Sequence, residues 1–313
     1  MTSTEEPGGR RSRSDGGIRA RFSHAAPYFL LGPGIVWLAI LFIFPTLWML
    51  LISLSSGNIE SGFRLTFTTS AYSAALSQFS RQFGNSITFG TIATILCFAI
   101  GFPVAYTIAF RGGRYKNLIL FLVIAPFFTS FLIRTISWKI LLGDNGPLLS
   151  WLKVHPASDP NPTLNLLAPD FSLLGGPVAV IAGLTYNFLP FMILPIYASL
   201  ERIDERLIEA AKDLYASSRQ AFWRVTLPLS APGIVAGTLL TFIPASGDYV
   251  NAQFLGSAGN QMVGNVIQSL YLKQTDYPSA AALSFVLMGL IMIAVVVYIR
   301  FAGSEALMGE EAQ

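Results

Sequence analysis

The chain has few of the residues that a soluble enzyme or a disulfide-bonded protein requires. Its 313 residues include one cysteine, two histidines and only 12% charged residues, whereas soluble domains average about 25%. Cys97 cannot form an intrachain disulfide and is expected simply to pack in an apolar stretch. His24 and His155 have no metal-ligand spacing around them, and no Ser/His/Asp set is suggested. The phosphate-binding pattern GxxxxGK[ST] is absent, so we expect no ATP hydrolysis and no other catalysis by this chain.

Apolar residues, by contrast, are abundant. They make up 53% of the chain, and the mean hydropathy is +0.57. Six apolar stretches reach the roughly 20 residues that a helical membrane span needs. The spans are expected near residues 28–52, 85–110, 118–142, 177–200, 233–255 and 280–301. The first stretch is too long for the apolar core of a signal peptide, so we expect it to be retained as a span.

Lysine and arginine are concentrated in the N-terminal tail, in the loop around 111–116 and in the loop 201–232. This asymmetry predicts that both termini and the 201–232 loop are cytoplasmic. Residues 1–26 are rich in Gly, Ser and Arg and are expected to be a disordered basic tail. The six-span domain is expected over 27–302, with a cytoplasmic tail at 303–313. The pI near 9.0 then reflects topology, and we expect no nucleic-acid partner.

The loop between the fourth and fifth spans has the pattern of a helix, a turn and a second helix. One helical face carries Ile203, Leu207, Ala211 and Leu214 at i, i+4, i+8 and i+11. Ser217 followed by Gln220 three residues later predicts a capping box at the start of the second helix. The prolines at 228 and 232 are expected to end that helix before the next span.

This loop resembles the EAA loop of the membrane-spanning subunits of bacterial ABC importers. The residues that match are Glu209, Ala210, Ala211, Ala216, Leu227, Pro228 and Pro232. The resemblance implies an all-α integral membrane fold with six transmembrane helices, of the MetI-like permease type that works with a binding protein.

The resemblance further implies that the loop is a coupling helix that seats in a cleft of a separate ATPase. The candidate coupling residues are Glu209, Ala210, Ala211, Asp213, Tyr215 and Ala216. Small residues would allow close approach, and Glu209 would pair with a basic group of the ATPase. An amphipathic loop lying on the membrane surface is the alternative.

Tyr215 stands where the family has glycine. A glycine there suggests a backbone with positive φ, which costs a residue with a side chain about 1 kcal/mol. Tyr215 could adopt that conformation, or the turn could be built differently with its ring packed against the ATPase. We expect the second arrangement, because aromatic residues are enriched in interface cores.

The resemblance also implies the partners. They are a second permease subunit, a cytoplasmic ATPase dimer that binds ATP and Mg²⁺, an extracytoplasmic substrate-binding protein and the lipid bilayer. No cofactor is expected in this chain. The loop 143–176 is long and polar, with Trp151, Asp144, Asp159 and Asp170. It could dock the binding protein or only cover the pore mouth.

Two segments resemble the spermidine/putrescine importer permeases, more closely the B-type than the C-type permease of the pair. Residues 127–141, FFTSFLIRTISWKIL, resemble the third span, and residues 242–272 resemble the fifth span and its following loop. The resemblance implies polyamine substrates. Other organic amines, or an anion such as phosphate, sulfate or thiosulfate, are the alternatives within this class.

The fifth span is interrupted at Pro244 and Gly247, and broken helices are tolerated where they line a cavity or are buried in protein. Asp248, Tyr249 and Asn251 follow the break, offering a carboxylate, a ring and an amide to a polyammonium solute. Asp248 could instead only cap the second half-helix.

Arg134 and Lys139 in the third span would repel a cation. We expect them to snorkel outward or to pair with a carboxylate of the partner permease or the binding protein. An anion importer would use them directly. An ion-coupled secondary transporter is the alternative of another class. It would show paired broken spans and intramembrane carboxylates, whereas one clear break and one candidate carboxylate are present.

Overall fold

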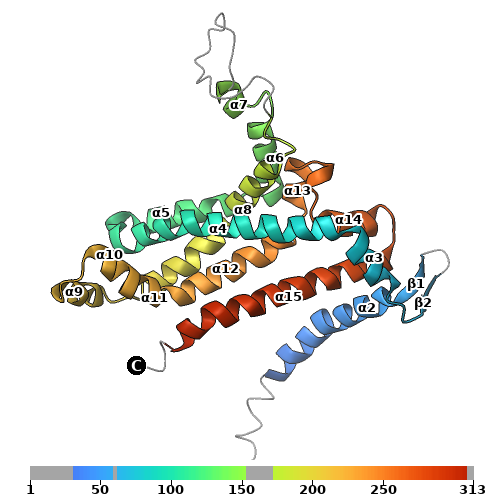
Figure 1. Ribbon diagram of the computed structural model, residues 1–313, viewed down its shortest axis with the longest axis horizontal. Helices are drawn as coiled ribbons and strands as arrows, with labels where there is room; N and C mark the ends of the chain where they lie inside the picture. The colour runs from blue at the N-terminus through green and yellow to red at the C-terminus, as the bar shows by residue number, and fades with distance from the viewer. Residues whose placement is uncertain (1–30, 59–61, 153–171, 309–313) are drawn as a thin grey trace, which may run out of the picture. The chain divides into compact units, whose positions relative to one another are not determined.

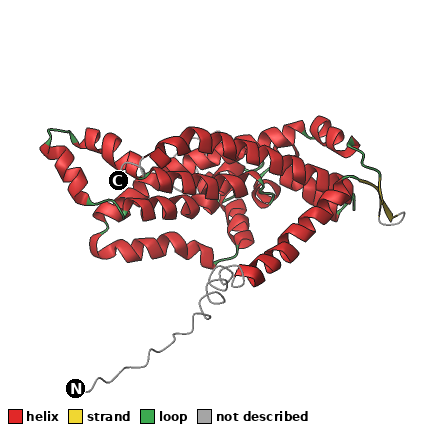
Figure 2. Ribbon diagram, turned by 90° about the horizontal axis from the view of Figure 1, so that it is seen from below, coloured by secondary structure: helices red, strands yellow, loops and turns green. Residues whose placement is uncertain are grey.

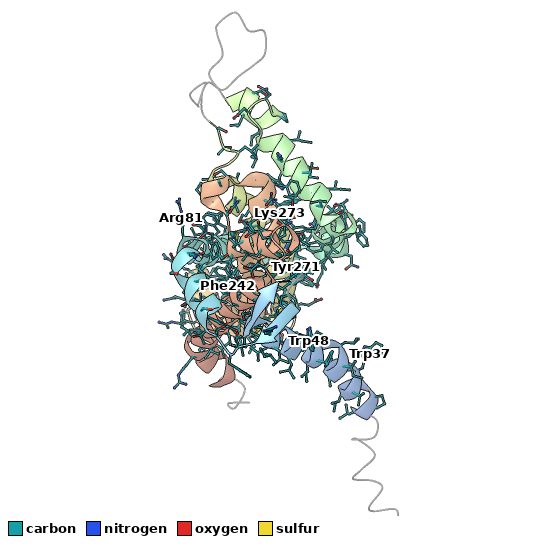
Figure 3. All side chains as sticks on the ribbon, turned by 90° about the vertical axis from the view of Figure 1, so that its right-hand side faces the viewer. Trp37, Trp48, Arg81, Phe242, Tyr271 and Lys273 are labelled. Atoms are coloured by element: carbon teal, nitrogen blue, oxygen red, sulfur yellow. The ribbon has the colours of Figure 1, made fainter. Side chains whose placement is uncertain are left out.

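The computed structural model describes residues 31–58, 62–152 and 172–308. The chain divides into two compact units, Met1–Ile52 and Ser53–Gln313. The described part of the first unit belongs to the helix Leu31–Ser53, which includes a π-helical segment, η1 (Ala39–Ile43), followed by α2 (Phe44–Ser53). The side chains of Trp37 and Trp48 project from this helix and are more than half exposed (Figure 3). Such an exposed apolar surface is expected of a membrane span that contacts lipid or another subunit.

In the second unit, three long helices pack side by side: α4 (Ser80–Arg111), α8 (Pro177–Leu200) and α12 (Ala231–Ser246) (Figure 1). Their shared core includes Cys97, Leu184 and Met192. The approach of α12 to α8 is close, because a Cβ atom at Gly233 would lie 2.5 Å from the carbonyl oxygen of Pro195. Small residues at such crossings let membrane helices pack through backbone contact.

A second apolar cluster joins α3 (Ser70–Gln78), the start of α4, α14 (Val263–Leu272) and α15 (Tyr277–Met308). Beside α15 lies a two-stranded antiparallel hairpin of β1 (Ser55–Asn58) and β2 (Gly62–Leu65), in which Ser55 pairs with Leu65. Strands appear only there among the described residues (Figure 2). The sequence analysis did not predict this hairpin, because its strands are short and polar.

Within the part of the chain that the structure describes, four helices are long and apolar enough to cross a membrane without a break: Leu31–Ser53, Ser80–Arg111, Pro177–Leu200 and Tyr277–Arg300. Two bent helix pairs bring the number of candidate spans to as many as six. Three further short elements are η2 (Gly113–Tyr115), α7 (Pro147–Leu152) and η5 (Ala258–Asn260).

The predicted third span is bent. The segment forms α5 (Lys116–Ile124), η3 (Ala125–Phe128) and α6 (Phe131–Leu142), and the chain bends by 93° between η3 and α6. Pro126 lies in the 3₁₀ turn, and Thr129 is extended with ψ 150°. Proline removes a helical hydrogen bond and disfavours helix in the residue before it, which accounts for the break in this apolar run.

The predicted break in the fifth span is confirmed. The helix α12 contains Pro244 and ends at Ser246, and α13 (Val250–Leu255) is a separate helix. At the other end of the chain, α15 continues to Met308, past the predicted boundary at residue 302. The basic tail 1–26, Asp159 and Asp170 lie outside the described residues.

Candidate functional site

The loop between α8 and α12 folds as α9 (Glu205–Asp213), α10 (Ser218–Ala221), the π-helical η4 (Phe222–Thr226) and α11 (Leu227–Leu229). These elements lie at the end of the second unit opposite α3 and α14 (Figure 1). The side chain of Asp204 caps α9 by accepting a hydrogen bond from the backbone N–H of Arg206 at 3.0 Å. Glu205 in the first turn and Lys212 in the last complement the helix dipole. The predicted first helix of the loop is therefore present and capped.

The turn after α9 corrects the expectation for Tyr215. Tyr215 has φ 62°, the left-handed conformation, and its N–H donates to the carbonyl of Lys212 at 2.9 Å. The N–H of Ala216 donates to the carbonyl of Ala211 at 3.1 Å, which completes a Schellman motif. The turn is thus the kind that favours glycine, and the preferred expectation of a differently built turn is wrong. The motif's two hydrogen bonds stabilise the left-handed residue.

The capping box predicted for the second helix is confirmed. Gln220 N–H donates to Ser217 Oγ at 3.3 Å, and Ser217 N–H donates to Gln220 Oε1 at 2.8 Å. The expectation that the prolines at 228 and 232 end this helix before the next span is confirmed, because the helical run ends at Leu229, between them. Pro228 lacks the N–H that would donate to the carbonyl four residues earlier. The π-helical segment η4, just before it, changes the hydrogen-bond spacing there, so the helical run continues through the proline.

The loop is attached to the bundle through an aromatic contact that sequence reasoning missed. The ring of Phe222 meets Phe102 edge-on at 5.7 Å and Tyr106 at 6.0 Å, both on α4. Lys116, at the start of α5, forms an ion pair of 2.6 Å with Glu201, just after α8. This hydrogen bond lowers the pKa of the Glu201 carboxyl. A large apolar residue in a charged loop was the available signal for Phe222.

The outer surface of the loop is open. We call Leu207, Glu209, Ala210, Asp213, Leu214 and Tyr215 the loop tip, because all six are exposed. Leu214 is 82% exposed and Tyr215 is 98% exposed. Among the described residues, Glu209 has no ion-pair or hydrogen-bond partner for its side chain. The remaining candidates, Ala211 and Ala216, are half-buried beneath the tip.

The second candidate region is the break between α12 and α13. Asp248 is buried, and its Oδ1 accepts hydrogen bonds from the backbone N–H of Asn251 at 2.8 Å and from Asn251 Nδ2 at 3.2 Å. Asp248 therefore does cap the start of α13, as one of the two interpretations held. Its Oδ2 accepts no hydrogen bond from the described residues and is not enclosed by them. One oxygen thus remains for another role.

Asn251 connects the break to two other helices. Asn187 Nδ2, on α8, donates to Asn251 Oδ1 at 3.1 Å and to Thr135 Oγ1 on α6 at 3.3 Å. All three residues are almost fully buried. The sequence analysis missed Asn187, although a lone amide within an apolar helix was a usable signal.

The structure brings Asp248 and Asn251 together, whereas the side chain of Tyr249 makes no hydrogen bond to either of them. The side chain of Tyr249 is 43% exposed, and its carbonyl accepts a hydrogen bond from Asn265 Nδ2 at 2.8 Å. Of the three residues predicted to contact the solute, Asn251 is enclosed and only Asp248 and Tyr249 reach a surface.

The expectation that Arg134 snorkels outward is wrong. Its side chain is buried, with the guanidinium 4.9 Å from the ring centre of Phe127 and 5.7 Å from that of Phe131. Arg134 Nε and Nη1 find no acceptor among the described residues. The bend before α6 places the first turn of that helix against these rings. Lys139 is exposed, and the pairing of either residue with another chain stays a prediction.

Comparisons with known proteins are consistent with this arrangement. Residues 101–304 match the family described as the binding-protein-dependent transport system inner membrane component. The spermidine/putrescine transport system permease protein PotB of Haemophilus influenzae is 37% identical over 265 residues, which cover 84% of this chain and 90% of that protein. PotB of Escherichia coli K12 is 36% identical over 261 residues, 82% of this chain and 92% of that protein.

Among solved structures, a bacterial ABC transporter involved in alginate import aligns with a TM-score of 0.69 and 17% identity, covering 92% of this chain and 98% of that one. The MetNI methionine ABC transporter aligns with a TM-score of 0.53 and 19% identity, covering 72% of this chain and 95% of that one. These two similarities concern the fold alone. They show that the chain has the MetI-like fold of ABC permeases, and the family match over residues 101–304 together with the two PotB relatives shows that it belongs to the binding-protein-dependent transport system inner membrane components.

Proposed function

We propose that this chain forms half of the translocation pore of an ABC importer for the polyamines spermidine and putrescine in a bacterial cell membrane. The observation that carries the proposal is identity above one third with two PotB permeases over more than 80% of the chain. The pore is completed by a second permease subunit. An extracytoplasmic binding protein delivers the solute, and a cytoplasmic ATPase dimer binds ATP and Mg²⁺.

The loop tip is proposed as the surface that the ATPase contacts. It combines three exposed apolar side chains, Leu207, Leu214 and Tyr215, with the carboxylate of Glu209, which has no partner among the described residues. A partner surface with an apolar cleft and a basic group would be complementary to this combination. The capped ends of α9 and the closed turn at Tyr215 hold these groups in a fixed arrangement.

Movement of the tip would reach the bundle through two attachments. Phe222 packs on α4, and the ion pair between Glu201 and Lys116 ties the end of α8 to the start of α5. We propose that closure of the ATPase pair moves these helices together with the loop. The chain itself then supplies no catalytic group, and the energy comes from hydrolysis in the partner.

We propose that Asp248 contacts the polyamine. Its Oδ1 is committed to the cap of α13, whereas Oδ2 is free to accept a charge-assisted hydrogen bond from an ammonium group. Tyr249, half-exposed beside it, offers a ring face for a cation–π contact. Asn251 is enclosed, so its role is to position Asp248 rather than to touch the solute.

An anion importer is the second candidate, and the buried Arg134 is the observation that favours it. However, Arg134 Nε and Nη1 are enclosed and the guanidinium lies over two phenylalanine rings, so these two donors are closed to a passing solute. We therefore place polyamines first.

The deciding experiment is uptake of labelled spermidine and putrescine by cells with and without this gene. We expect uptake to require the gene and to depend on ATP, with sulfate and phosphate uptake unchanged. Gene-dependent uptake of an anion and not of a polyamine would overturn the substrate assignment while leaving the permease family intact.

A further inference from the structure

A polar cavity of about 340 Å³ opens among α3, the start of α4, α14 and the start of α15. These elements lie at the end of the second unit opposite α9 and α10 (Figure 1). The volume is at the lower end of the roughly 300–1,000 Å³ typical of small-molecule sites. The polar side chains that define its character are Gln78, Gln82, Gln261, Gln274, Asp276 and Ser279.

The cavity offers one carboxylate to a ligand. Asp276 Oδ1 accepts a hydrogen bond from the backbone N–H of Ser279 at 3.1 Å, whereas its Oδ2 accepts none from the described residues and is not enclosed by them. Gln82 Oε1 also accepts none from the described residues, but it is enclosed and therefore closed to a ligand. Among the described residues that line the cavity, none is lysine, arginine or histidine. A ligand that brings both hydrogen-bond donors and positive charge would satisfy this carboxylate.

The backbone that places Asp276 is strained. Thr275, directly before it, has φ 53°, a left-handed conformation that is an outlier for a β-branched residue. The turn is held by hydrogen bonds from Asp276 N–H to the carbonyl of Leu270 at 3.0 Å and from Gln274 N–H to that of Ser269 at 3.1 Å. Conformations of this cost persist where the surrounding structure requires them, and they cluster at ligand sites.

We propose that this cavity binds the primary ammonium group of a small free amine, with the Asp276 carboxylate as its acceptor. The glutamines Gln78, Gln261 and Gln274, which also line the cavity, accept or donate along the rest of the ligand. The site shares no residue with the loop tip or with Asp248, and it does not require that the bound amine be the transported solute.

The experiment measures equilibrium binding of radiolabelled putrescine to the purified complex of both permeases and the ATPase dimer, without binding protein. An Asp248→Asn background removes the contact proposed for the pathway. Asp276→Asn keeps the cap on α15 but removes the charge, and it should weaken binding at least tenfold. Asp204→Asn, the same change at the cap of α9, is the matched control and should bind as the background does.

Elution of each variant as an intact complex in size-exclusion chromatography excludes loss of folding as the cause. Unchanged putrescine affinity in Asp276→Asn would overturn the proposal. It would also be overturned if free putrescine does not bind while, in a separate assay with the binding protein added, Asp276→Asn lowers the affinity of the complex for that protein, because the occupant would then be a lysine side chain. Absence of polyamine uptake by wild-type cells would reject the proposed function without altering these affinities.

Discussion

The N–H of Ala216 donates a hydrogen bond to the carbonyl of Ala211 at 3.1 Å, closing α9 around a left-handed Tyr215. The tyrosine therefore keeps the backbone of a glycine turn while presenting a ring that is 98% exposed. Substitutions of Tyr215 can therefore distinguish the effect of the backbone strain from the effect of the exposed ring.

Tyr215→Gly should relieve about 1 kcal/mol of backbone strain and yet weaken association with the ATPase, because the ring is lost. Tyr215→Phe keeps the ring and should associate as the wild type does. Co-purification of the ATPase at graded salt concentrations measures both variants. If the glycine variant associates equally well or better, the ring is not an anchor.

Glu209→Lys should abolish ATP-driven uptake while the protein still inserts in the membrane. Close charge pairs across interfaces contribute about 1.5–7 kcal/mol, and the reversed charge would face a basic group of the partner. Uptake by Glu209→Gln should lie between that of the wild type and that of Glu209→Lys. Uptake and ATPase co-purification at wild-type levels in Glu209→Lys would show that this carboxylate faces no basic group.

Asp248→Asn should raise the KM for a polyamine or lower transport, with the complex still assembled. Asparagine can replace the cap on α13 but cannot pair with an ammonium group, and the two residues cap helices about equally well. Asp248→Ala removes both roles and should also lower the amount of protein. Kinetics that are unchanged in the asparagine variant would assign Asp248 to structure alone.

Arg134→Met should reduce assembly with the second permease, because a carboxylate that the guanidinium meets there would be left buried without its partner, at a cost of about 3–5 kcal/mol. Lys139→Met, an exposed change on the same helix, is the control and should assemble normally. Yield of the heterodimer after tandem affinity purification is the measurement. Equal or higher yield in Arg134→Met would mean that no such carboxylate exists.

The ion pair between Glu201 and Lys116 predicts a pH dependence. The pKa of Glu201 is lowered in the folded protein by the hydrogen bond from Lys116. A group with a lowered folded pKa stabilises above its unfolded pKa, about 4.3 for glutamate, and loses this contribution as the pH falls through the folded value. The difference in melting temperature between the wild type and Glu201→Gln should therefore shrink as the pH is lowered from 6 to 3. A difference that is constant over this range would contradict the prediction.

The long helices of the second unit were predictable because apolar runs set their bounds directly. The helix α8 has the predicted limits, and α4 begins five residues earlier than expected. The capping box at Ser217 was predictable because it depends only on local chemistry. The 93° bend after η3 was not, since a single proline in an apolar run signals a kink without fixing its angle.

The tertiary contacts in the candidate site could not be predicted from the sequence. The hydrogen bonds of Asn187 depend on which faces of α6, α8 and α13 meet, and the packing of three helices decides this. The burial of Arg134 follows from the bend, which turns the first residues of α6 toward the rings of η3. The conformation of Tyr215 could be anticipated only from the glycine that it replaces.

The chain turns by 62° between the helical run Ser218–Leu229 and α12. A push delivered along that run therefore meets α12 mostly from the side, and only the smaller part of it is directed along the helix axis. If the loop transmits movement of the ATPase as proposed, it would work as a lever, and α12 should tilt rather than slide. Its far end, where Asp248 caps α13, would swing through the largest arc while the pivot near Ser230 stays almost in place.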